Sequence, residues 1–383
     1  MRKDTKNEIR IANGSVGRVR AVLEKLRAQS IFLVTHTIAY QNSGAEAKLE
    51  PFLSNQPVVR FTDFEPNPKL QEAERALELL KTNPCDVVLA VGGGSAIDMA
   101  KLVCIFAAQQ APPQEIIAGL PHLKPKQLPL IAVPTTAGTG SEATHFAVVY
   151  AEGKKYSVAH PSVLPDFAMV DPELTYDLPG DLTAVTGLDA LCQGIESLWS
   201  VQSTEESRSF ARKAVRLAWD TLETAVHRPT PQSRFAMCQA SHLAGRAINL
   251  SKTTAPHALS YSITSRCGIP HGHAVALTLG PILIYNSQVS SVDIGDARGV
   301  AYVRDSIKEI LDILGCRTPE EACQKIVHLM ESIGCSTRLS TLTKSSSELR
   351  KHIVENVNLE RLLNNPRTIG KVQVNQLLEF ILV

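Results

Sequence analysis

Hydrophobic and polar positions alternate in two different ways along the chain, and the change falls near residue 180. Before that point, short apolar runs are separated by amphipathic stretches, and the clearest runs are 31–34, 85–91 and 128–133. This order predicts βα units and a largely parallel sheet. Beyond that point, apolar positions follow helical spacing, as in 203–226 and 301–314, which predicts a mostly helical segment.

We therefore predict two domains. Residues 1–180 form an α/β domain with a largely parallel sheet, and residues 181–383 form an all-helical domain. The segment 174–180, which ends in Pro-Gly, is the expected linker. A chain of 383 residues is long enough to bury two cores of this kind.

Charge and composition narrow the class of partner. With 39 basic and 38 acidic residues the net charge is +1, which argues against nucleic acid and favours a small molecule. The N-terminus is charged, and no apolar run approaches the ~20 residues of a membrane span, so we expect a soluble, cytoplasmic protein. The eight cysteines are scattered without CxxC pairs, which indicates reduced core residues.

Two of the predicted strands end in turns that are rich in glycine and hydroxyl groups. The strand at 85–91 runs into Gly92-Gly93-Gly94-Ser95, and the strand at 128–133 is followed by the turn 134–141. Glycines let backbone amides approach a diphosphate, and the N-terminus of the next helix adds partial positive charge. The pair predicts a nucleotide site at the ends of the strands; a tight turn capped by Ser95 is the alternative for the first.

The second half carries residues that suit a divalent metal. Asp189 and Gln193 are four residues apart, so a helix places them on one face. His257 and His271 follow, and a glycine and a proline interrupt any single helix between them, so these imidazoles have to converge through tertiary packing. A carboxylate, an amide oxygen and two imidazoles suit a transition metal that keeps one position open for substrate.

Five motifs, in this order and spacing, resemble the iron-containing (group III) alcohol dehydrogenase family. They are GGGSAIDMAK (92–101), PTTAGTGSEAT (134–144), LPDFAMVDPEL (164–174), GLDAL (187–191) and PHG (270–272). The resemblance covers almost the whole chain. It implies an N-terminal dinucleotide-binding domain and a C-terminal helical domain, with a divalent metal (Fe²⁺ or Zn²⁺) and a nicotinamide cofactor (NAD or NADP) in the cleft between them.

The resemblance also implies which side chains contact the cofactor and the metal. In the diphosphate turn it implies Gly93, Gly94, Ser95 and Asp98. In the second loop it implies Thr135, Thr136, Thr139, Thr144 and Phe146, and Lys155 matches a lysine that reaches a cofactor ribose. Asp189, His257 and His271 match three metal ligands.

The sequence departs from the family pattern at two binding positions. Gln193 stands where the family usually has a histidine ligand, so the metal has either four ligands or three with Gln193 beside them; loss of the metal is a third alternative. His36 stands where many members have an aspartate that holds the adenosine ribose. Without that carboxylate a 2′-phosphate is not repelled, and both NAD and NADP stay open.

The candidates for the proton donor also differ from the family pattern. Tyr261 lies four residues after His257, where relatives often carry a second histidine that relays the proton. A phenol can donate a proton, but its unperturbed pKa of about 10 has to be lowered by the metal or by a cation. His273 is the other candidate, and a packed or solvent-facing side chain is the alternative for each.

Lys252 is a candidate contact for an anionic substrate. It lies in SKTTA (251–255), a part of the family that is usually small and apolar, and a lysine with three hydroxyls suits a phosphonate, phosphate or carboxylate. A solvated lysine is the alternative. The segments SKTTAPHALSY and GIPHGHAVALTL are similar to the phosphonoacetaldehyde reductase branch of the family, which converts that aldehyde to 2-hydroxyethylphosphonate.

The prediction is therefore a metal-dependent oxidoreductase that transfers a hydride between NAD(P)H and a small aldehyde or primary alcohol. The metal acts as a Lewis acid on the carbonyl, and Tyr261, His273 or a water molecule delivers the proton. We expect a small-molecule substrate, no nucleic-acid or membrane partner, and a homo-oligomer, most simply a dimer. Two alternatives are a dehydroquinate-synthase-like lyase, which also uses NAD and a metal, and a catalytically silent nucleotide-binding protein.

Overall fold

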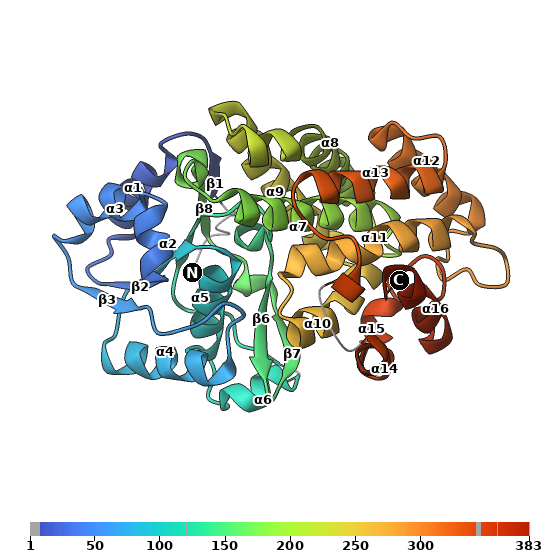
Figure 1. Ribbon diagram of the computed structural model, residues 1–383. Helices are drawn as coiled ribbons and strands as arrows, with labels where there is room; N and C mark the ends of the chain where they lie inside the picture. Colours follow the sequence, from blue (N-terminus) through green and yellow to red (C-terminus); the bar gives the residue numbers. More distant parts are fainter. Residues whose placement is uncertain (1–7, 120–121, 342–345, 358, 383) are drawn as a thin grey trace. The chain divides into compact units, whose positions relative to one another are not determined.

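The computed structural model describes residues 8–119, 122–341, 346–357 and 359–382, which fold into two compact units (Figure 1). The first unit comprises the described residues up to Leu178 together with Thr230–Cys238, and the second comprises Pro179–Pro229 and the described residues from Gln239 onward. The hydrophobic pattern does not predict that 230–238 packs with the first unit. One contact between this segment and the rest of the unit is a hydrogen bond over 2.8 Å, which the Arg234 guanidinium donates to the backbone oxygen of Leu178.

A six-stranded sheet forms the centre of the first unit, in the order β1-β8-β5-β4-β2-β3. Every neighbouring pair in it is parallel. The strands are β1 (Glu8–Ile11), β2 (Ile31–Thr35), β3 (Val58–Phe61), β4 (Val87–Gly92), β5 (Leu130–Pro134) and β8 (Phe167–Val170). The predicted α/β class is confirmed, and the three predicted apolar runs correspond to β2, β4 and β5.

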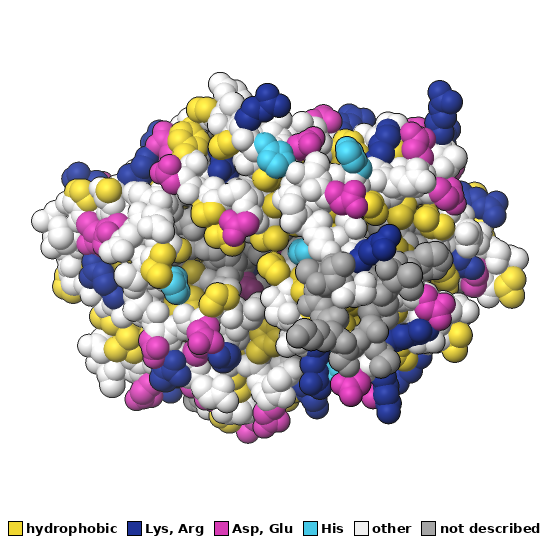
Figure 2. All heavy atoms as spheres, viewed as in Figure 1, with side chains coloured by type: hydrophobic (Ala, Val, Ile, Leu, Met, Phe, Trp, Pro, Cys, Tyr) yellow, Lys and Arg dark blue, Asp and Glu magenta, His cyan; other side chains and the backbone are white. Residues whose placement is uncertain are grey.

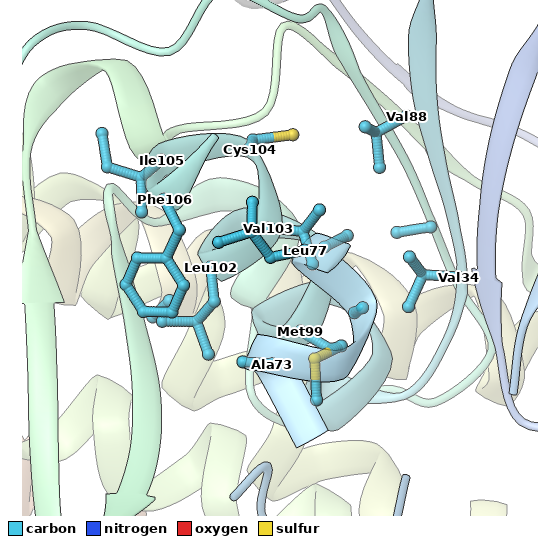
Figure 3. Close-up of a cluster of buried hydrophobic side chains, with 14 of the residues drawn as sticks. Val34, Ala73, Leu77, Val88, Met99, Leu102, Val103, Cys104, Ile105 and Phe106 are labelled. Carbon is cyan, nitrogen blue, oxygen red and sulfur yellow. The ribbon is translucent and has the colours of Figure 1, made fainter. Parts of the chain in front are cut away.

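Helices cover both faces of this sheet. Ile31 and Leu33 of β2 pack with α1 (Arg18–Leu26) and α3 (Ala45–Leu53), whereas Phe32 and Val34 pack with α4 (Leu70–Thr82) and α5 (Gly94–Phe106). Figure 3 shows the second cluster, in which Leu77 and Val103 lie near Val34. Because both faces are buried, the central strands are almost entirely apolar, and Thr35 at the end of β2 donates its hydroxyl hydrogen to the backbone oxygen of Val91 over 2.7 Å.

The remaining elements of the first unit are short. They are the helices α2 (Thr37–Asn42) and α6 (Pro113–Ile117) and the antiparallel hairpin of β6 (Phe146–Ala151) and β7 (Lys154–Ala159). The hairpin is anchored to the segment before α4, because the backbone N–H of Tyr150 donates to the oxygen of Pro68 over 2.8 Å.

The order of the strands places the predicted nucleotide turn at a topological switch point. From β2 the chain moves to β3 at one edge, whereas β4 lies on the other side of β2 and leads on to β5. Open α/β sheets bind ligands in the crevice outside the carboxyl ends of the strands at such a point. In this chain those ends carry Thr35-His36 after β2 and Gly92-Gly93 at the end of β4.

Helix α7 (Gly180–Trp199) is the central element of the second unit. It packs against α8 (Glu205–His227), α11 (His271–Ser287) and α12 (Val300–Leu314). Gly194 allows α8 to approach closely, because a Cβ at this position would lie 2.8 Å from Val215 Cγ2. The other helices are α9 (Pro231–Ser251), which begins in the first unit, α10 (Ala255–Cys267), α13 (Pro319–Ser332), α14 (Ser346–Asn356), α15 (Leu359–Leu362) and α16 (Lys371–Leu382). The predicted helical second half is confirmed.

The surface shows no preference for one sign of charge on the face in view in Figure 2, where basic and acidic side chains are interspersed. This agrees with the net charge of +1. Within the described ranges, no helix combines the length and apolar character that a membrane crossing needs. All eight cysteines are free thiols, and six of them are buried.

Candidate functional site

The two candidate histidines lie in the first turns of consecutive helices. Pro256 is tolerated at the start of α10, where its missing N–H leaves no helical hydrogen bond unmade. Helix α10 ends before Gly268, which has a φ of 67°, and α11 begins directly after Pro270. His257 therefore lies near the start of α10, and His271 is the first residue of α11.

Asp189, His257 and His271 come together inside the helical unit. One potential ligand atom of each lies within 4.8 Å of the others. His257 Nε2 is 3.3 Å from Asp189 Oδ1, and the two imidazole rings have centroids 5.3 Å apart. Asp189 and His257 are buried, and His271 is half-buried. A carboxylate oxygen and two imidazole nitrogens fit Fe²⁺ or Zn²⁺, and three ligands leave a coordination position for a substrate.

The close approach of α11 to α7 requires the glycine that follows His271. A Cβ at Gly272 would lie 1.9 Å from the backbone oxygen of Val185 and 2.9 Å from the Cβ of Asp189. Any side chain at this position would push the start of α11 away from α7. Gly272 therefore sets the separation between His271 and Asp189.

Sequence reasoning missed a second buried carboxylate, that of Glu196, which contacts the other nitrogen of His257. Glu196 Oε2 forms a short hydrogen bond with His257 Nδ1. Its Oε1 accepts from the backbone N–H and the hydroxyl of Thr254 over 2.8 and 2.9 Å. The signal in the sequence was a glutamate in an apolar stretch, seven residues after Asp189 and so on the same helix face.

Burial and charge have opposite effects on the pKa values in this cluster. Burial raises the pKa of Asp189, but a hydrogen bond with His257, the charge of His271 and the amide of Gln193 hold it below its usual range. Burial lowers the pKa of His257, but the charge of Glu196 and the contact with Asp189 raise it to about 10. Because metal ligands are deprotonated, a divalent cation bound here takes the place of a proton on His257.

Gln193 lies one turn after Asp189 on α7 and is buried. Its side-chain amide hydrogen bonds to the Asp189 carboxylate and helps to lower the pKa of that group. A carboxylate accepts hydrogen bonds, so the amide N–H₂ faces Asp189.

Tyr261 is beside His271, one helical turn after His257. The rings of Tyr261 and His271 are stacked, with centroids 6.1 Å apart and planes at 20°. Ser260 donates to the backbone oxygen of His257 over 2.8 Å, and its Oγ lies 3.4 Å from His271 Nδ1. Ser260 Oγ thus lies on the Nδ1 side of the His271 ring.

The structure does not bring His273 into this cluster. His273 follows His271 by two helical positions, which places it on the far side of α11. Its Nε2 donates to the backbone oxygen of Ser336 over 2.6 Å, and burial holds its pKa below the usual range.

Lys252 lies in the connection between α9 and α10, and its side chain is exposed. Its φ of 57° is in the left-handed region, which costs a non-glycine residue about 1–3 kcal/mol. The neighbouring hydroxyls point into the helical unit, because Ser251 contacts Ser197 over 2.6 Å and Thr254 accepts from Trp199 Nε1 over 2.8 Å.

The two turns predicted to bind a nucleotide lie against each other in the first unit. A Cβ at Gly93 would lie 3.3 Å from Thr136 Oγ1, and one at Gly94 would lie 2.7 Å from Thr139 Oγ1. The backbone N–H of Thr135 donates to the oxygen of Gly92 over 3.0 Å. Backbone amides at the start of α5 are thus next to hydroxyl groups, which is an arrangement that can hold a diphosphate.

Behind these turns a buried lysine holds the second loop to α5. Lys101 Nζ donates to Ser141 Oγ (2.9 Å), Thr144 Oγ1 (3.0 Å) and the backbone oxygen of Phe146 (2.9 Å). The carboxylate of Asp98 accepts from the Ser141 hydroxyl and from the backbone N–H of Val148. Asp98, Thr144 and Phe146, which the resemblance places at the cofactor, are therefore also the residues that join the loop to the helix.

Lys101 was not assigned a role from the sequence, although a lysine in the apolar run MAKLVCIF was a signal.

The other predicted cofactor contacts lie elsewhere in the first unit. Ser95 Oγ accepts from the backbone N–H of Asn67 over 3.1 Å. Lys155 lies on β7 and is half-buried. His36 lies at the end of β2, and its ring meets that of Phe64 edge-on with centroids 6.4 Å apart.

Comparisons with known proteins cover both units. The family model described as iron-containing alcohol dehydrogenase matches residues 6–172, and the model of the C-terminal part of the same family matches residues 183–382. The chain is 36% identical over 308 residues to the phosphonoacetaldehyde reductase of Streptomyces viridochromogenes, covering 78% of this chain and 77% of that one. It is 33% identical over 279 residues to long-chain-alcohol dehydrogenase 1 of Geobacillus thermodenitrificans, covering 72% and 71%.

A solved structure gives the same result for the fold. The sulfoacetaldehyde reductase of Bifidobacterium kashiwanohense, in complex with NAD+, matches with a TM-score of 0.86 and 32% sequence identity. The match covers 100% of this chain and 99% of that one.

Replacing Gly272 with alanine tests the role of the close approach between α7 and α11. We expect the added methyl group to separate His271 from Asp189 and to weaken Zn²⁺ binding at least 10-fold, with a loss of about 1–3 kcal/mol in stability from overpacking. Competition with a fluorescent chelator measures the dissociation constant. Gly17→Ala is the matched control, because nothing lies within 4 Å of a Cβ there; equal affinities of the two variants would contradict the expectation.

Replacing Lys101 with methionine tests the buried cation through its pH dependence. Burial lowers the pKa of Lys101 to about 8, although the negative charges of Asp98 and Glu142 act in the other direction and raise it. Between pH ~8 and the ordinary lysine value of ~10.4, the unfolded chain binds the proton and the folded chain does not, so Lys101 makes stability rise with pH.

The melting temperature of wild type relative to Lys101→Met should therefore increase over this interval. Calorimetry of both proteins in the same buffers measures the difference, and other groups that titrate there cancel. A difference that stays constant or falls would show that Lys101 keeps its proton in the folded state.

Proposed function

Because the chain belongs to the iron-containing alcohol dehydrogenase family, we propose that it reduces a small aldehyde that carries an anionic group, such as phosphonoacetaldehyde, to the primary alcohol. The chain is an oxidoreductase of that family, with a nicotinamide cofactor and a divalent metal. The observation that carries the proposal is the convergence of Asp189, His257 and His271 in one buried cluster. Membership of this family argues against the alternative of a dehydroquinate-synthase-like lyase.

We propose that Asp189 and Nε2 of His257 and His271 hold the metal. When bound, the metal polarises the carbonyl oxygen as a Lewis acid, and the nicotinamide supplies the hydride. Glu196 and Ser260 fix the orientation of the two imidazoles, and Gln193 hydrogen bonds to the Asp189 carboxylate. Burial of Asp189 and His257 excludes water from this side of the site.

The proposal for the cofactor is that the glycine turn after β4 and the threonines of the loop after β5 hold the diphosphate. Gly93, Gly94, Thr136 and Thr139 supply the close packing described above. His36, at the carboxyl end of β2, is compatible with both NADH and NADPH, because it carries no fixed negative charge. Lys155 is the proposed contact to a ribose.

We propose that Tyr261 delivers the proton to the developing alkoxide. Among the three candidate catalytic side chains, it is the one that stacks on a residue of the metal cluster. His273 is held to Ser336 on the other side of α11 and does not enter this role.

Replacing Tyr261 with phenylalanine should lower kcat about 10²-fold or more at unchanged metal affinity. A kcat within 3-fold of wild type would assign proton delivery to water.

The anionic group of the substrate is proposed to contact Lys252. Two relatives of this chain are named for aldehydes with a phosphonate or a sulfonate group. Lys252 is exposed and lies directly before the helix that carries His257. Its left-handed backbone conformation costs free energy, and strain of this kind is often found at binding sites.

Turnover by the purified protein tests the proposed substrate class. With added Fe²⁺ or Zn²⁺, oxidation of NADH and NADPH is followed with phosphonoacetaldehyde, sulfoacetaldehyde, acetaldehyde and lactaldehyde. We expect kcat/KM to be highest with the two anionic aldehydes. Turnover of the neutral aldehydes alone would contradict the anionic substrate, and no turnover with any of them would favour a silent nucleotide-binding protein.

Lys252→Ala in the same assay isolates the anion contact. We expect KM for phosphonoacetaldehyde to rise about 10-fold, as for the loss of one charge-assisted hydrogen bond, and KM for acetaldehyde to stay within 3-fold. Lys213→Ala, at another exposed lysine of the helical unit, is the matched control for charge. An equal loss on both aldehydes would contradict the role of Lys252.

Two further properties belong to the proposal. A homodimer is expected because β1 and β3 are edge strands of the sheet, and the unpaired backbone groups of an edge strand can pair with another chain. Light scattering of the purified chain measures its mass.

A cytoplasmic location is expected because all eight cysteines are free thiols. Cell fractionation tests it.

A further inference from the structure

We propose that Glu196 is a positioning residue that fixes His257 in the one tautomer that can bind the metal. This inference rests on the proposed metal site and concerns a side chain that need not touch substrate, cofactor or metal. Glu196 is fully buried on α7, and its carboxylate lies against the start of α10. Carboxylates that hydrogen bond to a ligand histidine orient its ring and increase its basicity.

The hydrogen bonds around Glu196 determine which nitrogen of His257 carries the proton. Glu196 Oε2 faces Nδ1, and a carboxylate oxygen accepts, so the proton is on Nδ1. Nε2 lies 3.3 Å from Asp189 Oδ1 and carries the proton that a bound cation displaces, so Nε2 is the nitrogen whose lone pair the cation takes while Nδ1 stays protonated. His257 is thus held between two carboxylates of the same helix, one on each ring nitrogen.

The other oxygen of Glu196 fixes the position of the carboxylate itself. Oε1 accepts from the backbone N–H of Thr254 (2.8 Å), its hydroxyl (2.9 Å) and the backbone N–H of His257 (3.4 Å). The Thr254 hydroxyl in turn accepts from Trp199 Nε1 over 2.8 Å. Glu196 therefore supplies acceptors to the first turn of α10, which has N–H groups without helical partners.

A glutamine at this position would fit the space but would reverse the tautomer. Its single oxygen would face the donors of Thr254, and its amide N–H₂ would face His257 Nδ1. Nδ1 would then have to accept, so the proton would move to Nε2, the nitrogen that faces Asp189. The Glu196→Gln variant thus keeps volume and helix contacts while removing the lone pair that binds the metal.

The experiment measures metal binding by the full-length chain without any aldehyde. Metal-free protein is titrated with Zn²⁺ against a fluorescent chelator, and with Co²⁺ to record its visible absorption spectrum. Glu196→Gln is expected to bind Zn²⁺ 10- to 100-fold more weakly and to change the Co²⁺ spectrum. Thr254→Val is the matched control: it removes the hydroxyl and its contacts with Glu196 and Trp199 but keeps the backbone N–H donor to Glu196, and its Zn²⁺ affinity should stay within about 3-fold of wild type.

A double-variant cycle keeps the inference testable if Glu196→Gln is less stable than wild type. If Glu196 acts through His257, adding Glu196→Gln to His257→Ala causes no further loss of Zn²⁺ affinity. Additive losses, or a Glu196→Gln variant that binds Zn²⁺ as wild type does, would overturn the inference.

The two proposals fail in different ways. A wild-type protein that binds Zn²⁺ and loses it in Glu196→Gln, yet reduces no aldehyde, would contradict the proposed function and support this inference. A wild-type protein that reduces phosphonoacetaldehyde, with a Glu196→Gln variant of unchanged metal affinity, would support the proposed function and overturn this inference.

Discussion

The burial of two carboxylates on one face of α7 is the constraint on which the helical unit depends. Asp189 and Glu196 are both almost inaccessible to solvent, and a buried charge without partners is strongly destabilising. The imidazole of His257 lies between them, and the N–H groups at the start of α10 surround Glu196. These contacts determine where α10 begins, and Gly272 then allows α11 to bring His271 to the same place. A metal-binding cluster is thus the arrangement in which these buried charges are satisfied.

The first unit also contains a buried charge that is surrounded by hydrogen-bond partners, but this charge is positive. Lys101 is fully buried and donates to two hydroxyls and a backbone oxygen of the loop after β5. Because Lys101 is on the helix that follows the glycine turn, this contact holds both turns at the carboxyl ends of β4 and β5. In each unit, a buried charged side chain on a helix contacts the residues that we propose to bind the ligand. Such residues are conspicuous in a sequence once burial of the surrounding helix is recognised.

The sequence alone predicted the fold class, the main buried strands and the helical second half, because apolar runs and helical periodicity report burial directly. It did not predict the four-residue strands β1, β3 and β8, which are too short to show a pattern. It also did not predict the packing of 230–238 with the first unit, where Arg234 contacts a backbone oxygen that is distant in sequence. Asp189, His257 and His271 were predicted from residue type and spacing and do converge. Glu196 and Lys101 stand out as charged residues in apolar runs, but their roles were missed because the hydrogen-bond partners that define these roles are distant in sequence. His273 points away from the cluster because it lies two positions after His271 on α11, and this spacing becomes informative only once α11 is known to begin at His271.

We propose that side chains from α7, α10 and α11 hold one divalent metal. Anomalous diffraction at the absorption edge of the metal, from crystals of the wild-type chain grown with Fe²⁺ or Zn²⁺, tests it most directly. We expect one strong peak per chain, at a bonding distance of about 2.0–2.2 Å from an Asp189 oxygen and from Nε2 of His257 and His271. A peak at another group of residues, or none between these three side chains in metal-loaded crystals, would contradict it.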